Sequence, residues 1–298
     1  MRPGISRGIA GALLACVTLL AVSACANPPG TDGDLTNQWP AIAAPAGWEP
    51  KVGTCHTDFA ATLYRATHKP VDCASDHRYE TVHLGQFTGD ALNPGTPPSA
   101  DSAAMKAAWA ECDAKTTEFL GGDWRDGRIW FGVSVPSSGN WAGGARWFRC
   151  EVSASEDAWG ARPISWSKSL KGEFSGSSDL KFGCFINPPE EEKPLEAVAC
   201  TTPHNAEFVG VVAVSDAWET LKDNLPSIHT KCRSAIAKYV GVPDDSNLKY
   251  RTGSSYGYPS ENEWEAGNKT VRCHIYLSKN VTRSLKGTGT GGLPINYR

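Results

Sequence analysis

Two stretches of the chain decide the fold: VDCASDHRYETV at residues 71–82 and VACTTPHNAEFV at residues 198–209. Aligned without a gap, they share the pattern Val-x-Cys-x3-His-x2-Glu-x-Val. Further along, Pro-Ser precedes a tryptophan and then Arg-Cys at identical distances in both halves, with the tryptophans at Trp141 and Trp264. Two such agreements indicate that the chain contains an internal duplication.

The cysteines follow the same duplication. Eight of the ten divide into two groups of four with similar gaps: Cys55, Cys73, Cys112 and Cys150, then Cys184, Cys200, Cys232 and Cys273. In an oxidising compartment each group is expected to form two disulfides, although four cysteines permit three pairings and spacing does not choose among them. We favour Cys55–Cys73, Cys112–Cys150, Cys184–Cys200 and Cys232–Cys273, because each bond would tie a helix or loop to a strand.

Each repeat shows the same order of expected elements when hydrophobic period and breaker residues are considered. A strand, a helix and two strands are expected at residues 80–87, 102–120, 128–135 and 145–153, and again at 207–214, 227–240, 248–256 and 270–278. The predicted fold class is α+β, with two tandem disulfide-stapled domains. Each domain would pack one principal helix on a small antiparallel sheet.

The N-terminus is typical of an export signal. Arg2 and Arg7 precede an apolar run at residues 9–22 that is too short to span a bilayer comfortably. The run LAVSAC at residues 20–25 resembles the bacterial lipoprotein signal, in which Cys25 receives lipid and becomes the mature N-terminus. Cys16 ends a similar run but would leave too short an apolar segment. An ordinary secretory signal is the alternative.

These features give a predicted domain organisation. The expected parts are a signal peptide at residues 1–24, the lipidated Cys25 with a flexible stalk at 25–47, a first domain at 48–153, a linker at 154–179, a second domain at 180–279 and a flexible tail at 280–298. The linker contains aromatic residues that could dock it onto a domain, namely Trp159, Trp166 and Phe174, and this possibility is left open. The formal net charge of -3 provides no strongly basic field, so nucleic acid is not an expected partner.

The shared Cys-x3-His-x2-Glu is the one element that could carry chemistry, through His77 and Glu80 or His204 and Glu207. A thiolate, an imidazole and a carboxylate can bind zinc, and a Cys-His pair can form a nucleophile. The spacing lacks paired Cys-x2-Cys knuckles, however, and a strand would place side chains three residues apart on opposite faces. We therefore expect a structural role, with ligand binding second and metal or thiol chemistry third. No catalytic residue, metal or cofactor is predicted.

Tryptophans are the other candidates for binding. Trp124, Trp130 and Trp147 could form an aromatic platform for a glycan, because exposed rings supply rigid apolar area. Trp141 and Trp264 occupy the same place in both repeats and are also candidate binding residues, although a buried structural role is favoured for them.

Taken together, the Val52-Gly53-Thr54-Cys55 opening, the Cys-His-Glu segment, the helix cysteine and the Trp-containing approach to the last cysteine resemble the actinobacterial septum-formation domain family. The resemblance covers about residues 50–153 and 180–279. Pro203 matches the family's proline before histidine, where the first repeat has Asp76, and the second opening is shortened to Phe182-Gly183-Cys184. The resemblance implies an exported protein linked to cell division, with no established enzymatic activity.

The expected function is therefore that of a non-enzymatic lipoprotein on the outer face of the cytoplasmic membrane, facing the cell wall. Its lipid would hold it in the membrane, and its two domains would bind envelope or division proteins. A peptidoglycan- or glycan-binding envelope protein is the second hypothesis. A metal- or thiol-dependent exported enzyme is the third.

Overall fold

The computed structural model describes residues 30, 32–34, 47–92, 95–156, 162–187 and 195–296. The expected signal segment and Cys25 lie outside these residues. Pro45–Arg298 forms one compact unit. Among the described residues, no helix is both long enough and apolar enough to cross a membrane.

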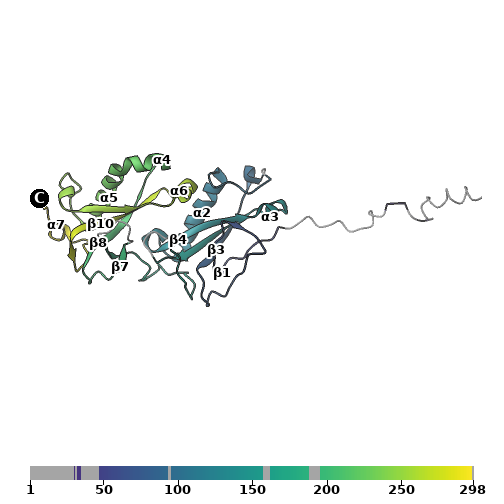
Figure 1. The fold of residues 1–298 in the computed structure, drawn as a ribbon, viewed down its shortest axis with the longest axis horizontal. Helices are drawn as coiled ribbons and strands as arrows, with labels where there is room; N and C mark the ends of the chain where they lie inside the picture. Colours follow the sequence, from purple (N-terminus) through teal and green to yellow (C-terminus); the bar gives the residue numbers. More distant parts are fainter. Residues whose placement is uncertain are drawn as a thin grey trace, which may run out of the picture. The chain divides into compact units, whose positions relative to one another are not determined.

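The first repeat is a five-stranded sheet with one long helix against it (Figure 1). Its strands are β1 (Cys55–His56), β2 (Thr62–Leu63), β3 (Tyr79–Gln86), β4 (Ile129–Pro136) and β5 (Trp147–Ala154). Its helices are η1 (Gly89–Leu92), α2 (Ala103–Leu120), η2 (Trp124–Asp126) and α3 (Ser138–Ala142), where η denotes a 3-10 helix. The strand order is β1-β3-β5-β4-β2, and the pairs are antiparallel except for β2 beside β4.

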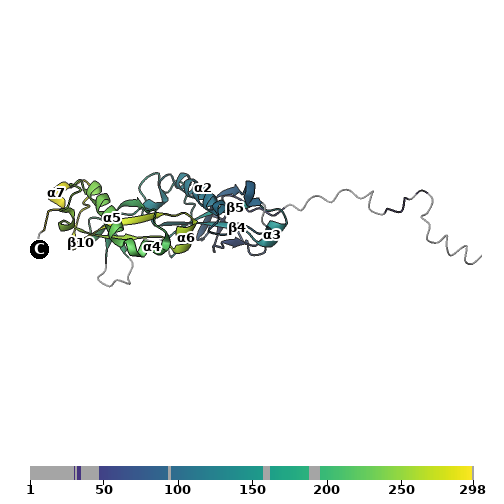
Figure 2. The same cartoon turned by 90° about the horizontal axis from the view of Figure 1, so that it is seen from above.

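The second repeat has the same plan, with α5 against its own sheet (Figures 1 and 2). Its strands are β6 (Cys184–Ile186), β7 (Glu196–Val198), β8 (His204–Ala213), β9 (Gly253–Gly257) and β10 (Thr270–Val281), in the order β7-β6-β8-β10-β9. Its helices are α4 (Trp218–Leu221), η3 (Lys222–Asn224), α5 (Leu225–Val240), η4 (Leu248–Tyr250), α6 (Glu261–Ala266) and α7 (Gly289–Gly292).

Four strands are equivalent between the sheets. The order β1-β3-β5-β4 in the first repeat corresponds to β6-β8-β10-β9 in the second. The register agrees as well, since Cys55 lies opposite Glu80 and Cys184 lies opposite Glu207. The predicted α+β class, with one principal helix on a small sheet in each of two repeats, is confirmed.

The ends of the principal helices follow from local sequence. The Ser102 hydroxyl accepts the Met105 N–H, which satisfies a free donor in the first turn of α2. Gly121 and Gly241 end the helices at φ values of 75° and 83°, a backbone region that favours glycine. Helix α5 begins two residues earlier than expected, because Pro226 lies in the first turn, where its missing N–H costs nothing.

The strand predicted at residues 248–256 is only partly correct. Residues Leu248–Tyr250 form η4, and the Arg251 N–H donates to the Leu248 carbonyl in a turn. Pairing with β10 is limited to Gly253–Gly257. The local turn therefore takes the backbone groups that a longer strand would have needed.

All four disulfides have the expected pairing: Cys55–Cys73, Cys112–Cys150, Cys184–Cys200 and Cys232–Cys273. In each repeat one bond joins the principal helix to the strand equivalent to β5. The other joins the strand that carries the first cysteine to the loop before the histidine of the repeated motif.

The segments after each sheet pack more closely than the sequence suggested. In the segment expected to be a linker, Leu170 and Phe174 are 2% and 3% exposed within the first core, and Trp166 packs against it. Trp159 lies outside the described residues. In the segment expected to be a flexible tail, Leu285 and Leu293 are buried in the second core. Both segments belong structurally to the repeat that precedes them.

Candidate functional site

Each repeat brings the histidine and glutamate of the repeated motif together with its first cysteine, which is the disulfide partner of the motif cysteine. The groups are Cys55, His77 and Glu80 in the first repeat and Cys184, His204 and Glu207 in the second. Within each group the sulfur, one ring nitrogen and one carboxylate oxygen all lie within 4.8 Å of one another, and all six residues are buried. The structure therefore contains two copies of one buried cluster.

The expectation that histidine and glutamate would lie on opposite faces is wrong. His77 precedes β3 and forms an isolated bridge with Trp166, so the alternation of a regular strand does not apply to it. His204 is the first residue of β8, where its partner is Val281, beyond a register irregularity in β10. In both repeats the irregular backbone lets the imidazole turn toward the glutamate.

The two imidazoles are held by equivalent hydrogen bonds. The Nδ1 of His77 lies 2.8 Å from the Ser75 carbonyl oxygen, and the Nδ1 of His204 lies 2.7 Å from the Thr202 carbonyl oxygen. Because a carbonyl only accepts, Nδ1 must carry the proton in both rings. The Nε2 of His204 faces the Oε1 of Glu207 at 3.3 Å. The ring orientation is thus fixed by the loop before the strand.

The glutamates receive a second set of bonds that the sequence analysis missed. Ser169 and Leu170 donate their hydroxyl and N–H to the Glu80 carboxylate at 2.7 and 2.9 Å. In the second repeat, Ser284 and Leu285 make the same two bonds to Glu207 at 2.9 Å each. Both pairs belong to a Ser-Leu-Lys-Gly sequence, at residues 169–172 and 284–287. This repeated tetrapeptide was the signal that could have identified the partner of each glutamate.

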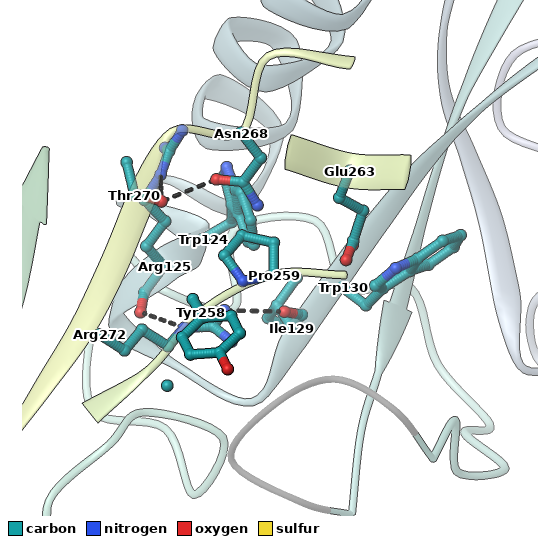
Figure 3. A pocket seen from close by; sticks show the side chains of 11 residues that line it. Trp124, Arg125, Ile129, Trp130, Tyr258, Pro259, Glu263, Asn268, Thr270 and Arg272 are labelled. Atoms are coloured by element: carbon teal, nitrogen blue, oxygen red, sulfur yellow. Dashed lines mark hydrogen bonds between the residues drawn. The ribbon is translucent and has the colours of Figure 1, made fainter. Parts of the chain in front are cut away.

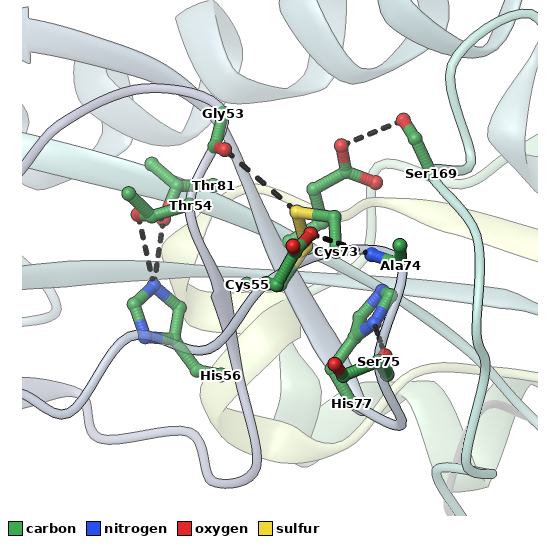
Figure 4. Close-up of a disulfide and its surroundings, with 12 residues drawn as sticks. Gly53, Thr54, Cys55, His56, Cys73, Ala74, Ser75, His77, Thr81 and Ser169 are labelled. Carbon is green, nitrogen blue, oxygen red and sulfur yellow. Dashed lines mark hydrogen bonds between the residues drawn. A yellow bond between two sulfur atoms is a disulfide. The ribbon is translucent and has the colours of Figure 1, made fainter.

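The tetrapeptide also binds the end of the principal helix. Gly172 donates its N–H to the Phe119 carbonyl at 2.8 Å, and Gly287 donates to the equivalent Tyr239 carbonyl at 3.0 Å. Both glycines have positive φ values, 72° and 69°. Each cluster therefore joins the first cysteine strand, the histidine loop, the glutamate strand and the segment that follows the sheet. Figure 4 shows the surroundings of the Cys55–Cys73 disulfide in the first cluster, with His77 and Ser169 nearby.

This arrangement uses the cysteine sulfurs and the glutamate carboxylates within the fold. Cys55, Cys73, Cys184 and Cys200 are in disulfides, so none of their sulfurs is a thiolate that could attack a substrate or bind zinc. Glu207 also accepts the Tyr239 hydroxyl at 3.0 Å. A buried carboxylate with several donors is a strong structural anchor, because each bond is assisted by its charge.

The first repeat holds a second buried polar group on β5. Arg149 and Glu151 are 1% and 0% exposed and lie 2.9 Å apart, and His56 Nε2 is 3.4 Å from the same carboxylate oxygen. Burial raises the pKa of Glu151 to about 7, although Arg149 and the Thr81 hydroxyl favour its ionised form. Burial also lowers the pKa of His56 to about 3, and the charge of Arg149 acts in the same direction. At neutral pH Arg149 is therefore the cation of this group.

The two repeats differ at the equivalent positions, Arg272 and His274 on β10. His274 is fully buried among the rings of Phe182, Phe185 and Phe208, with centroid separations of 5.6–6.4 Å. Burial lowers the pKa of His274 to about 3. The Arg272 side chain instead reaches the first repeat, where it donates to the Ile129 carbonyl at 3.3 Å.

Most of the candidate tryptophans are parts of the core. Trp141 and Trp264 are 1% and 0% exposed, and Trp124 and Trp147 are 4% and 0% exposed. The favoured buried role therefore describes these four rings, and the alternative, a three-ring platform of Trp124, Trp130 and Trp147, is not formed. Trp130 is half-buried, and it lines a cleft between the repeats together with the edge of the buried Trp124.

The fold and these clusters define a class: a duplicated α+β protein stapled by disulfides, in which each copy repeats one buried Cys-His-Glu cluster. Residues 52–276 match the family model described as septum formation, and the chain belongs to this family. The family supports a role related to cell division. Searches of curated proteins and of solved structures found no match.

Proposed function

We propose that the protein is a lipid-anchored, exported binding protein that acts without enzymatic chemistry in the cell envelope during septum formation. The observation that carries the proposal is the use of the repeated cysteines, histidines and glutamates as internal ties in both copies. A binding module needs a rigid scaffold to hold its contact residues in place. The same internal bonds supply this rigidity in both repeats.

Export is supported by the cysteine chemistry. Four disulfides in one chain are typical of proteins that fold outside the cytoplasm. The N-terminal LAVSAC sequence favours lipidation at Cys25, with the domains on the outer face of the cytoplasmic membrane and facing the wall. A diacylated cysteine supplies two acyl chains, enough for stable anchoring. Two modules held at one surface would raise the effective concentration of any partner bound there.

The proposal is tested by locating a fluorescent fusion of the full chain in dividing cells of an actinobacterium that carries it. We expect enrichment at new septa, loss of that enrichment in Cys25→Ala, and no change in the matched control Cys16→Ala. A palmitate analogue should label the unsubstituted protein and Cys16→Ala but not Cys25→Ala. A uniform envelope signal for the unsubstituted protein would rule out the septal role and favour general binding in the wall.

A separate measurement addresses the thiol or metal enzyme. Peptide mapping of the purified full chain without reductant should recover all four disulfides. A free thiol at Cys55 or Cys184, together with bound zinc, would instead favour chemistry at the Cys-His-Glu clusters.

A further inference from the structure

The cleft between the repeats combines aromatic rings with uncommitted polar atoms (Figure 3). Trp130 comes from β4 of the first repeat. Tyr258 and Pro259 come from the loop between β9 and α6, Glu263 from α6, and Asn268 from the turn before β10. Neither repeat holds the full set of residues, so the cleft exists only in the duplicated protein.

The Trp130 ring is held in place before any ligand arrives. It packs edge-on against Phe59 at a centroid separation of 4.8 Å and against Tyr79 at 6.0 Å. The ring also lies close over Gly132, where an added Cβ would collide with it. A ring fixed in this way loses little conformational freedom on binding, which favours affinity.

Tyr258 provides a second ring at the cleft. Its side chain is 37% exposed, yet the ring stacks on Tyr256 at 6.2 Å and packs edge-on against Trp218 at 5.7 Å. Exposed rings that are supported from behind are the usual contact surfaces of binding sites, because they combine apolar area with rigidity.

Two oriented polar groups accompany these rings. Glu263 Oε2 accepts the N–H and the hydroxyl of Ser260 at 2.9 and 2.7 Å, and no bond to Oε1 occurs within the described residues. Asn268 Oδ1 accepts the Thr270 hydroxyl at 2.7 Å, while its Nδ2 donates to no group in the described part of the chain. In Figure 3 the Glu263 carboxylate points toward the Trp130 indole. One acceptor and one donor therefore remain for a ligand.

The cations at the cleft are already engaged. Arg125 forms ion pairs with Asp113 and Asp123 at 2.8 and 3.2 Å. Arg272 donates to the carbonyls of Arg125 and Ile129 and stacks over Trp124. A carboxylate with a vacant oxygen beside engaged arginines disfavours phosphate and other anions. The cleft is thus suited to a neutral ligand with hydroxyl groups and apolar faces.

We propose that this cleft binds a neutral glycan chain, with pyranose rings lying on Trp130 and Tyr258 and their hydroxyl or amide groups bonded to Glu263 and Asn268. The C–H faces of a sugar ring match an aromatic surface, and the hydroxyls match a carboxylate and an amide. This inference rests on the proposed binding function and names its ligand class.

The test is calorimetric titration of the full chain, purified in detergent, with the tetramer of N-acetylglucosamine. We expect saturable binding that is insensitive to salt, because no charge is neutralised. Trp130→Ala and Tyr258→Ala should each weaken it by about 10- to 100-fold, the usual range for aromatic anchors. Tyr276→Ala, which removes a ring that is 43% exposed and absent from the cleft lining, should leave binding unchanged.

The polar contacts are tested by two variants on one helix, of which one is the control. Glu263→Gln should weaken binding several-fold, roughly the value of one hydrogen bond to a charged group. Glu261→Gln, at an exposed position of the same helix, should not. Circular dichroism and the thermal midpoint of each variant show whether it remains folded. Absence of binding to the unsubstituted protein, or equal binding by folded Trp130→Ala and Tyr258→Ala variants, would overturn the inference.

The outcome is separable from that of the localisation experiment. Septal enrichment without glycan binding would overturn this inference and leave the proposed function standing. Glycan binding with a uniform envelope signal would support this inference and overturn the septal role. Tight binding of polyphosphate, lost at high salt and preferred over the sugar tetramer, would also overturn a neutral ligand.

Discussion

At the scale of single residues, Glu207 is the best-connected side chain of the duplicated motif. Its carboxylate accepts from Tyr239, Ser284 and Leu285 while it is fully buried. We predict that Glu207→Gln lowers the free energy of unfolding by roughly 2–3 kcal/mol, because the amide NH2 cannot accept and leaves buried donors without a partner.

Denaturant titration measures this effect against a matched exchange. Glu196→Gln lies at an exposed position on β7 of the same repeat and should change stability by no more than about 0.5 kcal/mol. Glu80→Gln should behave like Glu207→Gln, since Ser169 and Leu170 make the same bonds to it. Equal costs for Glu196→Gln and Glu207→Gln would contradict an anchoring role.

His274 gives a prediction for pH. Its pKa is about 3 in the folded protein, against 6.5 for an exposed histidine. Between these values the unfolded chain takes up the proton first, so the contribution of His274 is complete above pH 6.5 and is lost as the pH falls toward 3. The advantage of the natural protein over His274→Gln should therefore shrink by roughly 2–3 kcal/mol between pH 7 and pH 4.5.

Urea unfolding of the two proteins at both pH values gives this difference directly. Other titrating groups occur in both chains, so their effects cancel in the comparison. An advantage of the same size at pH 7 and at pH 4.5 would show that His274 is not held neutral by burial.

At the scale of elements, the Ser-Leu-Lys-Gly segment after each sheet is a structural element in its own right. Leu285 is 1% exposed in the second core, and its N–H is bonded to Glu207. We predict that Leu285→Ala costs about 2–5 kcal/mol, the usual range for a buried leucine, whereas the neighbouring exposed Lys286→Ala costs little.

Hydrogen exchange provides the direct measurement for this element. The amides of Leu285 and Gly287 should be protected, because both are hydrogen-bonded within the fold. Exchange at the rate of an unstructured peptide would restore the earlier expectation of a loose tail.

The elements also show what could be predicted from sequence. Both principal helices and most strands followed from periodicity, from Pro226 and from the glycines after each helix. The glutamate partners did not, because Ser169 follows the last cysteine of its repeat by 19 residues and Ser284 by 11 (169 − 150 and 284 − 273). An alignment without gaps therefore misses the tetrapeptide. The cleft could not be predicted either, since it depends on how two repeats meet.

At the scale of the whole molecule, the equivalent arginines Arg149 and Arg272 have different roles in the two repeats. Arg149 turns into its own repeat and pairs with Glu151. The equivalent Arg272 reaches across to the other repeat, and Trp124 and Phe182 lie under its guanidinium at 5.4 and 5.3 Å. Because β10 carries His274 where β5 carries Glu151, Arg272 has no carboxylate two residues away. The Arg272 side chain instead bonds to the carbonyls of Arg125 and Ile129 in the first repeat.

The contacts that Arg272 makes with the first repeat predict cooperative unfolding of the two repeats. Arg272 spans the interface, and the chain segments beside it are paired through the Arg128 N–H to the Leu180 carbonyl at 2.7 Å. We expect a single calorimetric transition for the natural protein. Arg272→Ala should split or broaden it, because it removes bonds from a charged donor whose removal typically costs about 1–3 kcal/mol. Arg283→Ala, at an exposed position on the same repeat, should leave one transition. Two transitions in the natural protein would contradict cooperative unfolding of the repeats.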